Sequence, residues 1–167
     1  DSAASDYITS DSVPSQLDTV SLSIWLKTDG TQQNYAGVLG VRNTGAAAPT
    51  YGVCWDLVFD TSNQIQFRVS DTAFKTVVQN SPMTDDTWTH VVGVADGTNV
   101  FLYINGVKQT DTSTYSPPLL TPTNNIYIGA QGVSPTTNEF KGRLDEAAVF
   151  NYGLNQAQIT QIYNNGY

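Results

Sequence analysis

Carboxylates are the most numerous reactive side chains in this 167-residue sequence, which holds 15 acidic residues, 7 basic residues and one histidine. A pair of carboxylates can hydrolyse a glycosidic bond when the two groups lie about 5–9.5 Å apart. Asp145 and Glu146 are adjacent in an alternating segment, so a strand there would point them to opposite faces. Asp56 and Asp60 would share a face, but the strand between them would separate them by about 13 Å. The spacing of these carboxylates therefore does not favour an acid–base pair.

The single histidine and the single cysteine restrict nucleophilic and zinc chemistry. His90 lies on the same alternating face as Trp88 and Val92, which favours a structural role for its ring. Cys54 lies in a segment predicted to be a strand, where a buried inert thiol is the simplest interpretation. One histidine and one cysteine cannot supply the usual ligands of a zinc site, and a lone cysteine cannot form an internal disulfide. We expect no catalytic residues in this chain.

The net charge of the chain excludes some classes of binding partner. A net charge of −8 argues against nucleic acid and against an anionic membrane surface, because both require clustered Lys and Arg. No apolar run is long enough to insert into a membrane. The abundance of Asp leaves room for Ca²⁺, which prefers carboxylate and carbonyl oxygens. The composition is rich in Asn, Thr and Ser and poor in Lys, as in large bacterial secreted and surface proteins, so we expect an extracellular location.

The elements that must position any site are strands, because apolar and polar residues alternate with a period of two along most of the chain. Asp96-Gly97 and Asn105-Gly106 are hairpin turn sequences. The chain shows no internal repeat and no change in composition, so we expect a single domain over residues 1–167. The predicted fold is all-β, a two-sheet antiparallel sandwich or jelly roll. The predicted strands cover residues 20–28, 51–59, 64–69, 74–78, 87–95, 100–104, 107–110, 125–130 and 143–150.

One short C-terminal helix is predicted after the last strand. Asn155 can cap its first turn, and Gln158 three residues later can complete a capping box. Ile159 and Ile162 then fall on one face. This helix is too short to be stable alone, so we expect it to dock on the sandwich.

Two segments add information beyond periodicity. Residues 86–106 contain Asp86-Thr-Trp-Thr-His90 and Phe101-Leu-Tyr-Ile-Asn105-Gly, and residues 140–154 read Phe-Lys-Gly-Arg-Leu-Asp-Glu-Ala-Ala-Val-Phe-Asn-Tyr-Gly-Leu. Together they resemble the laminin-G-like, concanavalin A-like jelly-roll domains of bacterial secreted proteins. That fold class also houses glycanases, but their Glu-x-Asp-x-Glu pattern is absent from this sequence.

The resemblance implies non-catalytic recognition of a glycan or polysaccharide by a monomeric module of a longer secreted protein, such as a bacterial adhesin. A protein-binding module and a structural spacer are the two alternatives, and a glycoside hydrolase ranks below both. An exposed apolar patch would favour the protein-binding alternative.

The resemblance also implies a structural calcium ion near the termini, with an aspartate that matches Asp145. Asp6 near the N-terminus is the second candidate side-chain ligand of this ion, and backbone carbonyls would complete the coordination. Asp29 is a further candidate metal ligand, because Asp29, Asp56, Asp71 or Asp85 could supply carboxylates to a calcium ion that grips the hydroxyl groups of the sugar. The alternative is that Asp145 hydrogen-bonds a neighbouring loop without a metal.

Glycan binding requires exposed aromatic rings and side chains that hydrogen-bond to hydroxyl groups. Trp55 offers a ring beside a carboxylate, although burial of this ring is the alternative interpretation. We expect the glycan to bind through loops at one edge of the sandwich. The candidate ligand-binding residues are Tyr35, Arg42, Trp55, Asp56, Gln131 and Asn138.

Overall fold

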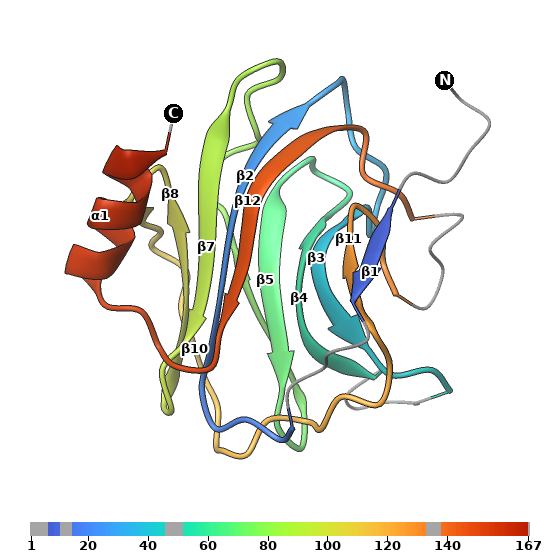
Figure 1. Cartoon of the computed structure of the whole chain (residues 1–167), viewed down its shortest axis with the longest axis vertical. Coiled ribbons are helices and arrows are strands. Elements are labelled where there is room, and N and C mark those ends of the chain that lie inside the picture. The colour runs from blue at the N-terminus through green and yellow to red at the C-terminus, as the bar shows by residue number, and fades with distance from the viewer. Residues whose placement is uncertain (1–6, 11–14, 46–51, 133–137, 167) are drawn as a thin grey trace.

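A computed structural model of the chain describes residues 7–10, 15–45, 52–132 and 138–166, and it confirms the predicted two-sheet jelly roll (Figure 1). Sheet A has the strand order β1-β11-β3-β4-β5-β6, and sheet B has the order β10-β8-β7-β2-β12, with β9 paired to β8. All the described strand pairs are antiparallel.

Most of the strands lie in the alternating segments of the sequence. Sheet A consists of β1 (Ile8–Ser10), β3 (Gly37–Arg42), β4 (Val53–Phe59), β5 (Ile65–Ser70), β6 (Phe74–Val78) and β11 (Ile126–Ile128). Sheet B consists of β2 (Val20–Thr28), β7 (Thr89–Ala95), β8 (Asn99–Ile104), β9 (Val107–Lys108), β10 (Ser113–Thr114) and β12 (Gly142–Phe150).

The main hydrophobic core lies between the two sheets. Leu22 and Ile24 from β2 meet Trp55 from β4 and Phe67 from β5 in one buried cluster, and all four side chains are fully buried. Burying a side chain of this size stabilises the fold by about 1.5–3 kcal/mol. Because neighbouring residues of a strand point to opposite faces, this core determines which side chains of sheet A point outward.

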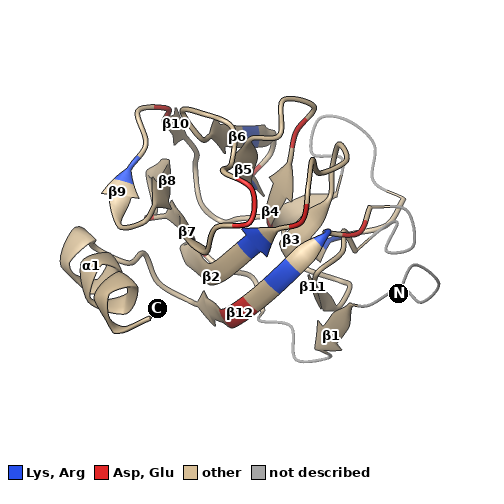
Figure 2. Cartoon of the chain, turned by 90° about the horizontal axis from the view of Figure 1, so that it is seen from above, with Lys and Arg blue, Asp and Glu red and all other residues tan. Residues whose placement is uncertain are grey.

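The C-terminal helix α1 (Gln156–Asn165) covers the outer face of sheet B, beside β7 and β8 (Figures 1 and 2). The predicted capping box is confirmed, since the side chain of Asn155 accepts a hydrogen bond from the Gln158 amide and the Gln158 side chain accepts one from the Asn155 amide. Ile159 is fully buried in a second cluster with Val92 and Val94. The helix is therefore held by its apolar face, as predicted.

His90 lies beneath α1 rather than in a cleft. The ring centroid of His90 is 5.1 Å from that of Trp25 and 6.0 Å from that of Tyr163, and its Nε2 lies 2.9 Å from the Ser23 hydroxyl oxygen. Burial lowers the pKa of His90 to about 4. The imidazole is therefore neutral at physiological pH and serves as packing.

The hairpin turns occur where the sequence predicts them, but β1, β3 and β10 were not predicted. Asn105 and Gly106 both adopt positive φ angles, of 50° and 76°, between β8 and β9. Strand β3 lacks regular alternation because Gly37 and Gly40 occupy it. A Cβ atom on Gly40 would lie 2.4 Å from the Cβ of Asp56, so the glycine lets β3 approach β4 closely.

Candidate functional site

The outer face of sheet A, on the side away from the core, carries polar side chains. On β5, Ile65 and Phe67 point into the core, so Gln66 and Arg68 point outward. A hollow of about 500 Å³ lies on this face, and we call it the sheet-A hollow. Its lining residues are Asn34, Tyr35, Arg42, Val53, Asp60, Thr61, Gln66, Arg68, Phe74 and Thr76.

A buried ion pair between Arg68, which lines the sheet-A hollow, and Asp56 lies beneath the hollow. The register pairs Asp56 on β4 with Arg68 on β5. The guanidinium of Arg68 donates two hydrogen bonds to the Asp56 carboxylate, from Nε at 2.7 Å and from Nη2 at 2.5 Å. The two side chains are 3% and 5% exposed, so each charge is stabilised by the other rather than by water. The guanidinium plane is therefore held in one orientation.

Two aromatic rings lie beside this guanidinium. The Arg68 Cζ atom is 5.4 Å from the ring centroid of Tyr35 and 5.7 Å from that of Phe74, distances typical of cation–π contacts. Phe74 begins β6, and Tyr35 lies in the loop before β3. The hollow therefore combines aromatic surface with an immobilised charged group.

Tyr35 reaches this position through an unusual backbone conformation. Its φ angle is 65°, in the left-handed region that bulky residues rarely adopt. Its amide donates a hydrogen bond of 2.8 Å to the carbonyl of Phe59, which fixes the loop against the end of β4. The side chain of Tyr35 remains 45% exposed. Residues held in sparsely populated backbone conformations cluster at functional sites.

Further polar groups border the hollow. Asp60 accepts hydrogen bonds from the Ser62 and Gln64 amides and from Gln66 Nε2. The hydroxyl of Thr76, which pairs with Arg68 in the register, is buried without a hydrogen-bond partner in the described part of the chain. This unpaired buried hydroxyl costs free energy, because it has lost its hydrogen bonds to water without gaining others.

Arg42 lies at the end of the hollow where β3 ends. Burial and the positive charge of Arg68 lower the pKa of Arg42, whereas the Asp56 carboxylate raises it. A guanidinium keeps its proton at neutral pH despite such shifts. Arg42 therefore brings a second positive charge to the hollow.

The six candidate ligand-binding residues do not all converge. Tyr35 and Arg42 line the sheet-A hollow, and Asp56 lies beneath it. A smaller recess is lined by Arg42, Asp56 and Gln131, and the side-chain oxygen of Gln131 accepts a hydrogen bond of 2.9 Å from Asn138. Trp55 lies on the opposite face of β4, fully buried in the core, so its ring does not reach the hollow.

The two candidate metal ligands that the structure describes, Asp29 and Asp145, lie apart from each other. Asp6 is outside the described residues. Asp29 follows β2, and its amide donates to the carbonyl of Lys141 just before β12, whereas Asp145 lies within β12. The intervening strand separates Lys141 from Asp145 by about 13 Å, too far for Asp29 and Asp145 to bind one ion. The Asp145 carboxylate accepts a hydrogen bond from the Glu146 amide.

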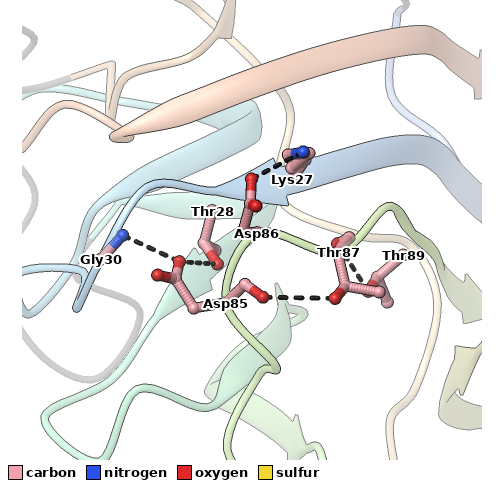
Figure 3. Close-up of polar contacts among 7 residues, drawn as sticks. All are labelled: Lys27, Thr28, Gly30, Asp85, Asp86, Thr87 and Thr89. Atoms are coloured by element: carbon pink, nitrogen blue, oxygen red, sulfur yellow. Dashed lines mark hydrogen bonds and ion pairs between the residues drawn. The ribbon is translucent and has the colours of Figure 1, made fainter.

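Asp85 uses its carboxylate to hold a loop (Figure 3). One carboxylate oxygen accepts hydrogen bonds of 2.8 Å from the Thr28 hydroxyl and from the Gly30 amide. These hydrogen bonds lower the pKa of Asp85. The neighbouring Asp86 forms an ion pair with Lys27. Within the described residues, no three His, Cys, Asp or Glu side chains form a group that could hold a metal ion, so the calcium site remains a prediction.

A second concave region lies on the flank of the sandwich, between the edge strands β1 and β12. This flank groove has a volume of about 590 Å³. Its wall is mainly apolar and includes Ile8, which is 65% exposed, together with Phe140 and Leu144. The full set of lining residues is Tyr7, Ile8, Ile128, Gly129, Phe140, Gly142, Leu144, Asp145, Glu146 and Ala147.

Arg68, Phe74, Thr76, Asp60 and Gln66 belong to the hollow but were not predicted as site residues. The alternation of β5 could have indicated that Gln66 and Arg68 face away from the core. No feature of the sequence gives the cross-strand register that brings Arg68 to Asp56. The aromatic Phe74 is indistinguishable in the sequence from a core residue.

The two-sheet jelly roll is an architecture that lectin domains share with viral capsid proteins and cupins. The family model described as the concanavalin A-like lectin/glucanases superfamily, of laminin-G type, matches residues 1–160. The chain belongs to this family, and the predicted resemblance is confirmed. A comparison with curated protein sequences gave no significant match. In the described part of the chain, no helix is long and apolar enough to cross a membrane.

Solved structures share the fold at low sequence identity. Domain 4 of AbnA, an extracellular GH43 arabinanase from Geobacillus stearothermophilus in complex with arabinotriose, is 19% identical with a TM-score of 0.68, over 90% of this chain and 68% of that chain. A putative carbohydrate binding protein from Bacteroides ovatus is 15% identical with a TM-score of 0.71, over 93% of this chain and 44% of that chain. A pentraxin from Limulus polyphemus is 12% identical with a TM-score of 0.66, and the match covers 94% of this chain and 75% of that chain. This chain thus spans less than half of the Bacteroides protein.

Proposed function

We propose that this chain is a non-catalytic carbohydrate-binding domain of a larger secreted or cell-surface protein, such as a bacterial adhesin. The glycan binds in the sheet-A hollow. The observation that carries this proposal is the exposed ring of Tyr35, which a strained backbone holds beside the immobilised Arg68 guanidinium. A sugar ring can stack on the aromatic surface while its hydroxyl groups bond to the fixed polar groups. The arabinotriose complex and the carbohydrate binding protein among the similar structures support a glycan ligand.

The proposal is tested on a glycan array with the wild-type domain and a Tyr35→Ala variant. We expect a consistent set of bound glycans, and a loss of about tenfold or more in affinity for the variant, because the stacking surface is removed. Tyr152→Ala is the matched control, since Tyr152 is also 45% exposed and lies outside the hollow. Equal losses for the two variants, or an empty array for the wild type, would contradict the proposal.

Because alanine keeps the strain of the left-handed conformation, Tyr35→Asn is made in parallel. Asparagine tolerates positive φ angles, so this variant removes the ring while preserving the loop. The free energy of unfolding of each variant is measured by urea denaturation. A loss of binding in a variant of wild-type stability then reflects the ring itself.

Calcium dependence is part of the proposal and rests on the family resemblance. The described carboxylates do not fit a shared ion, because Asp29 and Asp145 lie apart and Asp85 is engaged in hydrogen bonds. The test is the array repeated in millimolar calcium and in chelator, together with melting curves. A bound ion stabilises the folded state by about 2.7 kcal/mol at a concentration one hundred times its Kd. An unchanged melting temperature would rule out a structural calcium ion, including one bound by Asp6.

The flank groove is the observation that favours the alternative of a protein-binding module. It presents apolar side chains such as Ile8 and Leu144 at an open edge of the sandwich. Binding of glycans that is unaffected by Tyr35 variants would direct attention to this groove. A reducing-end assay on several polysaccharides tests the hydrolase alternative independently.

A further inference from the structure

The sheet-A hollow is long and narrow. Val53 begins β4 and Asp60 follows the last residue of the same strand, and both residues line the hollow. Along an extended strand these two positions are about 23 Å apart. A volume of about 500 Å³ spread over such a length leaves little width. The hollow is therefore several times longer than one sugar ring, and its shape suits a chain of sugars.

Two aromatic residues are anchored at opposite ends of β5. The amide of Tyr35 donates a hydrogen bond to the carbonyl of Phe59, which pairs with Ile65 at the start of β5. Phe74 pairs with Ser70, at the other end of that strand. Ile65 and Ser70 are about 17 Å apart along the strand. The backbones of Tyr35 and Phe74 therefore lie far apart in the direction in which the hollow runs.

The two rings approach the same guanidinium from these opposite ends. The Arg68 Cζ atom is 5.4 Å from the ring centroid of Tyr35 and 5.7 Å from that of Phe74. The Arg68 side chain is 3% exposed and donates two hydrogen bonds to the Asp56 carboxylate. The charges of this pair therefore neutralise each other, and this part of the hollow offers a ligand two ring surfaces. One sugar ring cannot cover both, because they lie on different sides of Arg68.

The end of the hollow at Tyr35 also offers the groups that hydrogen-bond to a sugar. Its lining includes the exposed side chains of Asn34 and Thr61 and the half-buried side chains of Asp60 and Gln66. Tyr35 is exposed, whereas Phe74 is half-buried, so Tyr35 presents the larger stacking surface. The first sugar of a bound chain is therefore held at the Tyr35 end, by stacking and by hydrogen bonds together.

We propose that the sheet-A hollow binds a segment of about three or more linked sugars in a linear polysaccharide, with Tyr35 stacking on one sugar and Phe74 on another. This inference rests on the proposed carbohydrate-binding function and names its ligand class. The chain lies along β4 and β5, and a sugar between the two stacked ones covers Arg68. Each added sugar buries further surface until both rings are covered, so affinity depends on chain length.

The experiment measures affinity against chain length by isothermal titration calorimetry. The ligands are arabino-, xylo- and cello-oligosaccharides, each from the monosaccharide to the hexasaccharide, and weak members are measured by competition with the hexasaccharide. The proteins are the wild-type chain, Tyr35→Asn and Phe74→Leu, since leucine keeps an apolar side chain and removes the flat ring. Phe101→Leu is the matched control, because Phe101 is also half-buried and lies on β8, outside the hollow. Urea denaturation gives the free energy of unfolding of each variant.

We expect the affinity of the wild type to rise, in at least one series, by about tenfold or more from the disaccharide to the tetrasaccharide, which corresponds to about 1.4 kcal/mol. Phe74→Leu should remove most of this rise, because the second stacking surface is lost. Tyr35→Asn should weaken the disaccharide as well as the tetrasaccharide. Phe101→Leu should keep the wild-type dependence on length.

Three outcomes overturn the inference. The first is a wild-type affinity that does not increase beyond the disaccharide, and a loss of array binding in Tyr35→Asn would then leave the proposed function standing. The second is an equal weakening of the disaccharide and the tetrasaccharide by Phe74→Leu, which would mean that Phe74 only supports the shape of the hollow. The third is an absence of binding to all three series, which would overturn the proposed function too if the glycan array is also empty.

Discussion

The sheet-A hollow and the flank groove have similar volumes, about 500 and 590 Å³, but opposite chemistry. The hollow lies on the face of a continuous hydrogen-bonded ladder formed by β3, β4, β5 and β6. The groove lies between β1 and β12, the edge strands of the two sheets. The ladder fixes cross-strand neighbours, so the hollow can hold a buried ion pair. The groove has no such ladder across it and is lined mainly by apolar side chains, so size alone does not identify a glycan site.

The largest expected effect is on the ion pair that distinguishes the hollow. Asp56→Ala leaves the guanidinium of Arg68 buried without its carboxylate, so the free energy of unfolding should fall by about 3–5 kcal/mol. Asp86→Ala removes the partner of Lys27 in an ion pair whose aspartate side chain is 83% exposed, and it should cost about 0.5 kcal/mol or less. Urea denaturation measures both. Similar values for the two variants would mean that the hollow is no more rigid than an ordinary surface.

Lowering the pH should reduce the free energy of unfolding, because His90 must be protonated when the protein unfolds. His90 lies beneath α1, so its protonation does not act directly on the hollow or on the groove. Its pKa is lowered by burial to about 4 in the folded protein, whereas an unfolded chain has a histidine pKa of about 6.5. The unfolded state therefore binds more protons between these values, and stability is complete above about pH 6.5 and falls as the pH falls towards about 4. The expected loss between about pH 6.5 and pH 4 is about 3 kcal/mol, measured by urea denaturation at several pH values.

The control for this pH dependence is His90→Gln, which should flatten the stability profile between about pH 6.5 and 5. The carboxyl groups of Asp71 and Asp85 have lowered pKa values. The stability that they contribute is lost only at a lower pH, so it does not affect the profile between about pH 6.5 and 5. A profile that is unchanged by His90→Gln would contradict the assignment. Glycan affinity measured at pH 6.5 on the folded protein should be unaffected.

A smaller effect separates stability from binding within the hollow. Thr76→Val replaces a buried hydroxyl that has no partner in the described structure, so stability should rise by up to about 1 kcal/mol while glycan affinity stays the same, because a ligand cannot contact the buried oxygen. Thr28→Val is the comparison, because the Thr28 hydroxyl donates to Asp85 and its loss should be destabilising by about 1 kcal/mol. Denaturation and calorimetry together test this contrast. A marked loss of glycan affinity in the Thr76→Val domain would contradict this separation of stability from binding.

The smallest expected effect lies in the flank groove. Ile8→Ser should change stability by about 0.5 kcal/mol or less, since Ile8 is already 65% exposed. Its affinity for glycans should equal that of the wild type in calorimetry. A marked loss of glycan affinity would reverse the comparison and place the sugar between the sheet edges.

Much of the fold could be predicted from the sequence, because alternation and turn residues act locally. The period-two pattern predicts the bounds of β2 and β12 to within one residue, and Asn155 with Gln158 predicts where α1 begins. The pattern fails for β3, where Gly37 and Gly40 replace the side chains that would alternate. Short edge strands such as β1 bury too little to leave a pattern.

The candidate site was less predictable, because it depends on long-range register. Tyr35 and Arg42 were predicted from their residue types, and the structure places both in the hollow. Trp55 was predicted to bind the ligand because it is a tryptophan, but in β4 its side chain points into the core and is fully buried. The pairing of Arg68 with Asp56 arises when β4 and β5 align, and neither strand specifies that alignment by itself.

The free side of β12 has a further consequence, for how the domain behaves at high concentration. Within the described residues, β12 pairs with β2 on one side, and its other side would offer backbone groups to a strand from another molecule. Arg143, Asp145 and Glu146 place charges of both signs on this strand (Figure 2). The register shifts between Asp145 and Ala148, and Glu146 adopts a φ angle of 49°, so the strand is not straight. These features oppose edge-to-edge aggregation, so that the domain can be concentrated without its copies joining their sheets.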